Sequence, residues 1–274
     1  MNKLWGPSVP WQGSFEETLL SYPEPNRPIF QTSLGAENTF SIPRPGRLDA
    51  VATSILDEKR RIIFHSPHTV NLGKSDNRGK GILQSLLNKS AEIDAKNLKI
   101  GVIAHIGRGE GSTLENVIEK VSSLIIPEGI TLYLENSAGQ GYELGWNLDS
   151  LEELFENLPK KIKLCIDTQH SFASGLCRWQ SPEEIDDFFN SMSENLWRRF
   201  RLVHLNDSKK PFGSKVDRHE KLLQGYIWGE EKAHQGLEFL LSFSLENKLP
   251  MILETPDSQG DLERLFKFAK KHGL

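Results

Sequence analysis

The sequence contains few cysteines and no long apolar segment. Two cysteines, Cys165 and Cys177, occur in 274 residues, which argues against a disulfide scaffold and fits a reducing compartment. No uninterrupted apolar stretch reaches the roughly 18 residues that a membrane-spanning helix needs. The N-terminal residues break into Gly6 and Pro7 before an apolar signal segment could form. We therefore expect an intracellular protein without a membrane span, located in the cytoplasm or nucleus and of either cellular or viral origin.

The chain also lacks an excess of positive charge. Its net charge is -4 at pH 7 and its pI is about 6.1. Because nucleic-acid-binding proteins are commonly basic on one face, the overall charge taken alone argues against a polyanionic partner. Hydrophobic residues at 37% and charged residues at 26% indicate a folded globular protein and exclude a disordered one.

Short β-rich runs alternate with amphipathic helical patterns along the whole chain. The strand candidates are Leu4–Val9, Pro28–Leu34, Arg61–Pro67, Lys99–Gly107, Thr131–Asn136, Lys161–Thr168, Arg201–Asp207 and Pro250–Pro256. Such repeats in a chain of this length favour a single α/β domain over residues 1–274, a (β/α)8 TIM barrel, which typically takes roughly 250 residues. A doubly wound open sheet is the alternative. No glycine-rich phosphate fingerprint follows the first strand, which weakens a dinucleotide-binding version of it.

Helix starts and one long loop can also be located. Capping boxes begin at Ser14, Ser112, Ser150 and Ser181. The stretch between residues 206 and 229 shows neither helical nor strand periodicity, and a structureless loop of that length is more often functional than idle.

The expected strand ends carry most of the candidate chemistry, since a TIM barrel forms its active site there. A lone histidine or carboxylate at such a place is usually a cap or a surface group. Many of them converging on one mouth would repel or desolvate one another unless cations lay between them. The set contains nitrogen and oxygen ligands and no thiolate, which suits zinc, with manganese or iron as substitutes, and it exceeds the needs of one ion. Its members are His65, His105, Glu135, Asp167, His170, His204, Asp217, His219 and Glu254.

Several motifs around these residues resemble the endonuclease IV family in order and spacing from about residue 60 to the end. They are His65-x5-Asn71-Leu-Gly73, Leu134-Glu-Asn-Ser-Ala-Gly-Gln-Gly141, Cys165-Ile-Asp-Thr-Gln-His170, His204-Leu-Asn-Asp-Ser-Lys209, Val216-Asp-Arg-His219 and Leu253-Glu-Thr255. The resemblance implies a xylose-isomerase-like TIM barrel that cuts DNA at abasic sites. Members of this family hydrolyse the phosphodiester with a trinuclear zinc centre and leave a 3'-hydroxyl and a 5'-deoxyribose phosphate.

Carried over by position, the resemblance implies three zinc ions. Glu135 is expected to bridge two of them, and Glu254 to orient or deprotonate the attacking water, so these two are the candidate catalytic residues. The first ion is assigned to Glu135, Asp167, His204 and Glu254; the second to His65, His105 and Glu135; the third to His170, Asp217 and His219.

The resemblance also points to a duplex DNA partner. Arg218 and Lys209 lie inside metal-binding motifs and are expected to grip phosphates. Family members open the duplex with side chains from the loops after the second and third strands, where this chain has His68-Thr69 in place of bulkier residues and Phe40 as a candidate substitute. The first strand also departs from the family pattern, with Ser8 where a histidine is usual.

The predicted function is therefore a zinc-dependent apurinic/apyrimidinic endonuclease of base-excision repair, which could also clean blocked 3' ends. No nucleotide cofactor is expected, and a monomer is the default. One alternative is a sugar isomerase or epimerase, because related barrels hold one or two metals with a set such as Glu135, Asp167, His204 and Glu254. The five additional ligands argue against it. The other alternative, a catalytically weak protein that binds damaged DNA, is disfavoured by the complete ligand set.

Overall fold

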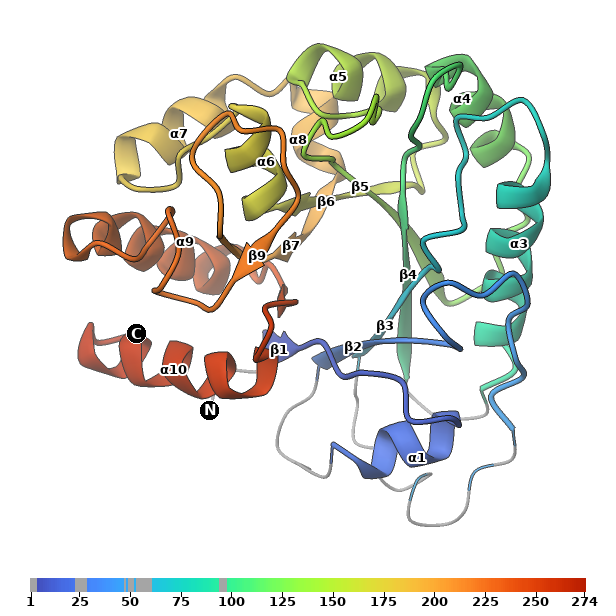
Figure 1. Ribbon diagram of the computed structural model, residues 1–274, viewed down its shortest axis with the longest axis horizontal. Coiled ribbons are helices and arrows are strands. Elements are labelled where there is room, and N and C mark those ends of the chain that lie inside the picture. Colours follow the sequence, from blue (N-terminus) through green and yellow to red (C-terminus); the bar gives the residue numbers. More distant parts are fainter. Residues whose placement is uncertain (1–3, 23–28, 47, 49–51, 53–60, 94–97) are drawn as a thin grey trace.

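The computed structural model describes residues 4–22, 29–46, 48, 52, 61–93 and 98–274. The parallel strands of one sheet curve into a barrel (Figure 1). The strand order is β1-β10-β7-β6-β5-β4-β3-β2. A parallel bridge between Ser8 and Gln31 joins the two edge strands, and the Val9 amide donates to the Gln31 carbonyl at 2.8 Å. The strands are β1 Trp5–Pro7, β2 Ile29–Ser33, β3 Arg61–His65, β4 Lys99–His105, β5 Ile130–Glu135, β6 Lys163–Asp167, β7 Phe200–His204 and β10 Met251–Leu253. The predicted (β/α)8 barrel is confirmed; the start of its second strand, at Pro28, lies outside the described residues.

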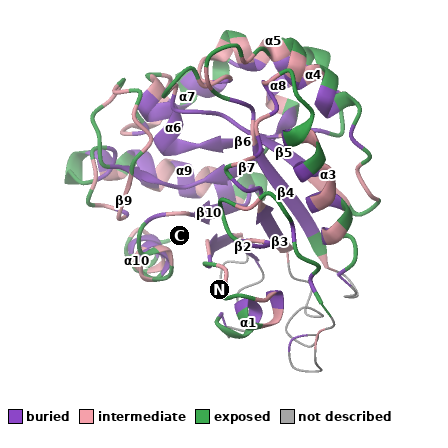
Figure 2. Ribbon diagram, turned by 45° about the vertical axis from the view of Figure 1, so that its right-hand side comes forward, coloured by how far each residue is buried: buried purple, intermediate pink, exposed green. Residues whose placement is uncertain are grey.

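Helices surround the sheet with their apolar faces turned inward (Figure 2). Ser14 and Ser181 cap α1 and α7 as predicted, each accepting from the main-chain N–H three residues on. No helix of the described segments is long and apolar enough to cross a membrane. The helices are α1 Phe15–Leu20, α3 Arg78–Ser90, α4 Leu114–Ser122, α5 Leu148–Asn157, α6 Thr168–Ser174, α7 Pro182–Asn190, α8 Glu194–Arg199, α9 His234–Asn247 and α10 Ser258–Lys271, with a short 3-10 turn η1 at Glu231–Ala233.

Two predicted helix starts are wrong by one to three residues. The caps predicted at Ser112 and Ser150 lie instead at Thr113 and Asn147, whose backbones are extended and whose side-chain oxygens accept from the N–H three residues on. Asn147 is as good a cap as serine, so the capping box at 150 competes with an equal signal one turn earlier. The Ser112 hydroxyl donates to the Arg108 carbonyl at 2.5 Å and is therefore engaged in the preceding loop.

The barrel interior is built in layers. One layer is apolar and buried, and it takes one side chain from each of seven strands: Ile29, Ile63, Ile103, Tyr133, Cys165, Leu202 and Ile252. Because side chains alternate along a strand, the residue two positions further on also points into the barrel. This second layer is polar and consists of Gln31, His65, His105, Glu135, Asp167, His204 and Glu254. The apolar layer thus forms the floor beneath the candidate site.

At the opposite end of the barrel, a buried arginine holds α5, β6 and α8 together. Arg199 is 3% exposed, and its guanidinium donates to the carbonyls of Phe155, Leu158, Pro159 and Ile162 at 2.6–3.1 Å. The carbonyls of Phe155 and Leu158 belong to the end of α5, which leaves them without intrahelical partners, and the other two belong to the turn before β6. One side chain therefore satisfies the carboxyl end of α5 and the turn that leads into β6.

We expect Arg199→Met to lower the free energy of unfolding by about 2–4 kcal/mol, because buried carbonyls lose their donors. The neighbouring Arg198 is exposed and pairs with Glu194, so Arg198→Met should change stability by no more than about 0.5 kcal/mol. Urea unfolding followed by circular dichroism measures both variants. Equal stability of the two variants would contradict the role given to Arg199.

Candidate metal centre

Six of the nine predicted ligands lie where their strands end. Strands β3 to β7 end in one ligand each, and a sixth, Glu254, directly follows β10. The five final residues of β3 to β7 are His65, His105, Glu135, Asp167 and His204. His105 pairs with Glu135 and Asp167 with His204, whereas His65 pairs with Ile103 and Glu135 with Cys165, so the ligands step by two residues between these neighbouring strands. Such steps are the stagger that tilted strands need to close a barrel, and they bring residues far apart in sequence together at its mouth.

His170 reaches the same place through a helix start. The α6 helix begins directly after β6, and the Asp167 carboxylate accepts from the His170 amide at 2.9 Å, which makes Asp167 the N-cap. His170 therefore lies one turn above Asp167 and is buried beside it, and its Nδ1 is 4.0 Å from Asp167 Oδ2.

The last two predicted ligands, Asp217 and His219, come from the long segment after β7. The expectation of a structureless loop is wrong there, because β8 (Asp207–Ser208) and β9 (His219–Glu220) pair as an antiparallel ribbon. The segment is organised by the buried Asp207, whose carboxylate accepts from the amides of Ser208 and Ile227 at 2.8 and 3.0 Å. Burial raises the pKa of Asp207 although these amides favour its charged form. The ribbon carries His219 back over the barrel mouth.

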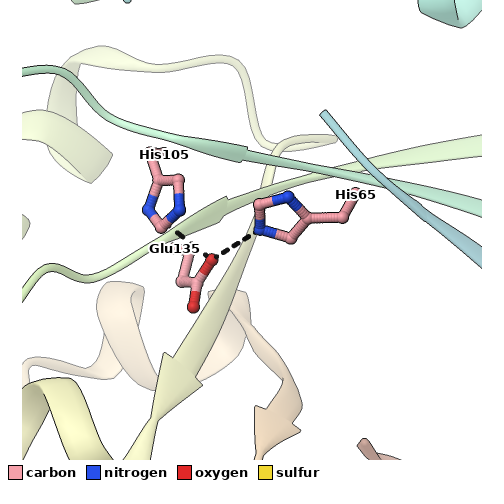
Figure 3. A group of neighbouring side chains, drawn as sticks. All are labelled: His65, His105 and Glu135. Carbon is pink, nitrogen blue, oxygen red and sulfur yellow. Dashed lines mark hydrogen bonds and ion pairs between the residues drawn. The ribbon is translucent and has the colours of Figure 1, made fainter. Parts of the chain in front are cut away.

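Eight of the nine side chains form three groups. The first contains His65, His105 and Glu135. Both imidazoles face the same carboxylate oxygen (Figure 3): Glu135 Oε2 is 3.3 Å from His65 Nε2 and 3.7 Å from His105 Nδ1. One oxygen cannot form good hydrogen bonds to both rings at these distances, but all three atoms surround a point that a cation could occupy.

The second group contains Glu135, Asp167, His204 and Glu254. His204 Nδ1 lies 2.8 Å from Glu135 Oε1 and 2.9 Å from Glu254 Oε2. Two carboxylates therefore converge on one nitrogen, although a single N–H can donate well to only one of them. Glu135 contributes one oxygen to this group and the other to the first.

The third group contains Asp167, His170 and His219. Asp217, which the sequence assigned here, also faces both imidazoles, with its Oδ1 3.5 Å from His170 Nε2 and 3.4 Å from His219 Nε2. The His219 Nε2 atom is buried and has no hydrogen-bond partner among the described residues. An unpartnered buried nitrogen beside carboxylates is the arrangement that a metal ligand requires.

Four of the five histidines use their second ring nitrogen in the way that metal ligands do. Each places it 2.8–3.3 Å from an amide or main-chain oxygen, so that in the neutral ring the proton lies on this nitrogen and the nitrogen that faces the carboxylates can bind a metal. The pairs are His65 with Ser66 O, His170 with Asn136 O, His204 with Gln31 Oε1 and His219 with Glu254 O. The residues present therefore fit a bound metal.

The electrostatics agree with this reading. Burial opposes ionisation of Glu135, but the imidazoles of His204 and His105 outweigh it and hold its pKa well below the ordinary value. Burial lowers the pKa of His105 to about 4. For His170 burial also disfavours the cation, yet Asp167 and Asp217 raise its pKa well above the ordinary value. Carboxylates that stay ionised in a buried site call for positive charge between them.

The predicted DNA-contacting residues lie around this mouth. Phe40 is 63% exposed in the loop after β2. The Thr69 hydroxyl donates to the Thr39 carbonyl at 2.5 Å, which ties the loops after β2 and β3 together, and His68 lines the cavity at the site. Arg218 lines an adjoining cavity, and the Lys209 amide donates to its carbonyl at 2.9 Å across the ribbon.

Sequence reasoning missed two buried amides in the site. Asn206 Nδ2 donates to Asp167 Oδ2 at 2.7 Å and to Glu254 Oε2 at 3.2 Å, and its Oδ1 accepts from the Glu254 amide. Gln31 contacts both His204 and Glu254. The signal for Gln31 was present, because it stands two residues after an apolar strand position, as the ligands do.

Similar proteins confirm the kind of barrel and its family. A family model described as "Xylose isomerase-like TIM barrel" matches residues 34–272. The "Probable endonuclease 4" of Carboxydothermus hydrogenoformans is 33% identical over 219 residues, which cover 77% of this chain and 75% of that protein. The "Probable endonuclease 4" of Symbiobacterium thermophilum is 36% identical over 205 residues, or 71% of each chain. The crystal structure of endonuclease IV from Thermus thermophilus has the same fold, with a TM-score of 0.77, 22% identity and coverage of 98% of this chain and 99% of that one.

The fold and the site together define a xylose isomerase-like TIM barrel whose mouth carries three groups of potential metal ligands. Within that class the chain belongs to the endonuclease IV family. The resemblance identified from the sequence, and with it the enzyme class, is confirmed.

Metal binding should displace protons, because the raised pKa of His170 means that its imidazole is charged in the metal-free protein and a ligand must be neutral. The affinity for the ion of the third group should therefore decrease as the pH falls, by about tenfold per unit for each displaced proton. Calorimetric titration of the metal-stripped protein in buffers of different ionisation enthalpy counts these protons. Binding without proton release at pH 7 would contradict the charge state given to His170.

Proposed function

We propose that this chain is a zinc-dependent apurinic/apyrimidinic endonuclease that hydrolyses the phosphodiester on the 5' side of an abasic site in duplex DNA. The observation that carries the proposal is the set of three ligand groups at one barrel mouth, two of them sharing Glu135 and two sharing Asp167. A sugar isomerase or epimerase that binds one or two metal ions would not need the third group of ligands. Hydrolysis of a phosphodiester can use all three, because charge develops on the attacking, non-bridging and leaving oxygens.

The donor atoms favour zinc over harder cations. Each group mixes imidazole nitrogen with carboxylate oxygen, whereas magnesium and calcium prefer oxygen alone. One ion would be held by His65, His105 and Glu135. A second would be held by His204, Glu254, Glu135 and Asp167, and a third by Asp167, His170 and His219 with Asp217 beside them. When bound, such ions lower the pKa of water, orient it for in-line attack and neutralise charge on the phosphoryl group.

Glu254 is the proposed residue that accepts a proton from the attacking water. Its carboxylate lines the cavity of about 240 Å³ at the mouth, and its side chain is 17% exposed, whereas Glu135 is 1% exposed and fixed between imidazoles. Hydrogen bonds from Asn206 and Gln31 hold the Glu254 carboxylate in place. Glu135 serves instead to join the first and second ligand groups.

Phosphate binding is proposed for the basic residues beside the metal centre. A second cavity of about 320 Å³ adjoins the mouth and is lined by Arg108 and Arg218, with His105 and Asp217 shared between the two cavities. Arginine forks match phosphate oxygens, so this cavity suits the DNA backbone next to the scissile bond. Lys209 would add charge on the ribbon.

Opening of the duplex is proposed for the joined loops after β2 and β3. Phe40 has an exposed ring on this rim and can act as a wedge, which architectural proteins commonly use to unstack a base step. His68 is half-exposed, and its carbonyl accepts from Arg108 Nη2 at 3.1 Å, which fixes the loop relative to the phosphate cavity. We further propose that residues 1–274 act as one catalytic domain, as an intracellular monomer in base-excision repair.

The first test is cleavage of a duplex oligonucleotide that carries one abasic-site analogue resistant to β-elimination. We expect a single incision 5' to the lesion that leaves a 3'-hydroxyl, no incision of the undamaged duplex, and loss of activity in chelator-stripped protein with return on adding Zn²⁺. Metal analysis should find about three ions per chain, as the three ligand groups require. Three bound ions with no incision would contradict the abasic substrate, and one or two ions would favour a sugar-metabolising enzyme.

Glu254→Gln should abolish incision while DNA binding persists, because the amide cannot accept the proton of the water. We expect kcat to fall by at least about 1,000-fold, within the range for loss of general-base and ligand functions. Glu37→Gln is the matched control, since Glu37 lines the same cavity but belongs to none of the three groups. Single-turnover cleavage and a gel-shift assay measure the two effects. Wild-type incision by Glu254→Gln would overturn its assigned role.

A further inference from the structure

Gln31 belongs to the same interior layer as the metal ligands and is the residue that β2 contributes to it. It follows the interior residue Ile29 by two positions, lines the site cavity and is 1% exposed. A buried amide is costly unless both of its ends form hydrogen bonds. The contacts of this side chain therefore show what it does.

Both ends of the Gln31 amide contact the second ligand group. Its Oε1 lies 2.9 Å from His204 Nε2, and its Nε2 donates to Glu254 Oε1. The orientation of the amide follows from the carboxylate, because the opposite orientation would place the amide oxygen against a carboxylate oxygen, two acceptors with no proton between them. The imidazole must then donate from Nε2 to the amide oxygen.

This bond decides which nitrogen of His204 is free. With the proton on Nε2, the lone pair of Nδ1 faces Glu135 Oε1 at 2.8 Å and Glu254 Oε2 at 2.9 Å. The hydrogen bond from Gln31 Nε2 holds Glu254 by its Oε1 atom. The other oxygen, Oε2, then faces His204 Nδ1 in the second ligand group. One side chain thus aligns a nitrogen and an oxygen toward one point.

Other neighbours do not duplicate this role. Asn206 binds the opposite oxygen of Glu254 and reaches Asp167, not His204. Ser8, which pairs with Gln31 across the closing seam of the barrel, has a short side chain on the adjoining strand. Within the described part of the chain, Gln31 accepts from His204 Nε2, and the thiol of the buried Cys165 also lies against this imidazole.

We propose that Gln31 is a positioning residue of the metal centre: it holds His204 in the tautomer with a free Nδ1, turns Glu254 Oε2 toward the same ion, and so sets the affinity of the second ligand group. The proposal rests on the proposed function in so far as this group binds a divalent cation. Outer partners of metal-binding histidines typically change metal affinity or activity about 10–100-fold when removed.

Gln31→Met tests it, because methionine has a similar length and can form neither hydrogen bond. The matched control is Ile29→Leu, on the same strand and the same face one layer below. Metal-stripped protein is titrated with Co²⁺, whose visible absorption reports ligand geometry, and kcat and KM are measured on the abasic oligonucleotide after reloading with Zn²⁺. In Gln31→Met we expect one of three ions to bind about 10–100-fold more weakly, with an altered Co²⁺ spectrum, a lower kcat and an unchanged KM. Ile29→Leu should match the wild type.

Gln31→Asn serves as a second variant, since it keeps the amide but is too short to span both partners, and it should weaken the same ion. Wild-type affinity for all ions and unchanged kcat in Gln31→Met would overturn the proposal, as would equal weakening of every ion. The proposed function can fail separately. If the wild type binds three ions and does not cut abasic DNA, but Gln31→Met still loses one ion, the positioning role stands.

Discussion

The structure depends on one electrostatic constraint: four carboxylates and five imidazoles occupy the mouth of a barrel whose floor is apolar. Glu135, Asp167 and His204 are 0–1% exposed, so water cannot screen them. Intramolecular hydrogen bonds satisfy only part of the set, because two carboxylates meet at one nitrogen of His204 and His219 Nε2 has no hydrogen-bond partner among the described residues. Such a concentration of buried charge is tolerable when cations lie within it. The parallel strands supply the positions, and in the metal-free protein protonated imidazoles such as His170 offset part of the carboxylate charge.

Much of this arrangement could be predicted from the sequence because it depends on local rules. A chemically distinctive residue at the end of an apolar run predicts a ligand at a barrel mouth, and the rule succeeds for β3 to β7 and β10. It fails for Gln31, since glutamine in the middle of a strand is not distinctive and its contacts, with His204 and Glu254, lie far along the chain. The ribbon of β8 and β9 was equally unreadable. Its strands have two residues each, too few for any periodicity, and its shape depends on Asp207.

The ligand groups differ in the elements that hold them. The first two use strand ends, which the sheet fixes on both sides. The third adds Asp217 and His219 from the ribbon, and Asp217 is 39% exposed. The ribbon is nevertheless anchored at its base by a buried carboxylate that gathers several main-chain amides. An element outside the sheet can thus carry ligands when an internal network restrains it, and Asp217 and Arg218 of this segment line the same cavity.

The acidic character of the chain is consistent with a polyanionic substrate once the location of the charge is considered. The net charge of -4 includes the four ligand carboxylates, and three divalent cations would add six positive charges at that point. Electrostatic attraction over distances beyond about 10 Å is screened at ordinary salt, so the local field at the mouth matters more than the sum over the surface. Arg108 and Arg218 reinforce this field beside the centre. Under the proposed function, specificity for a distorted duplex would follow from geometry. A phosphate that leaves the helical path would reach a recessed mouth behind the Phe40 rim more readily than a phosphate in a regular duplex.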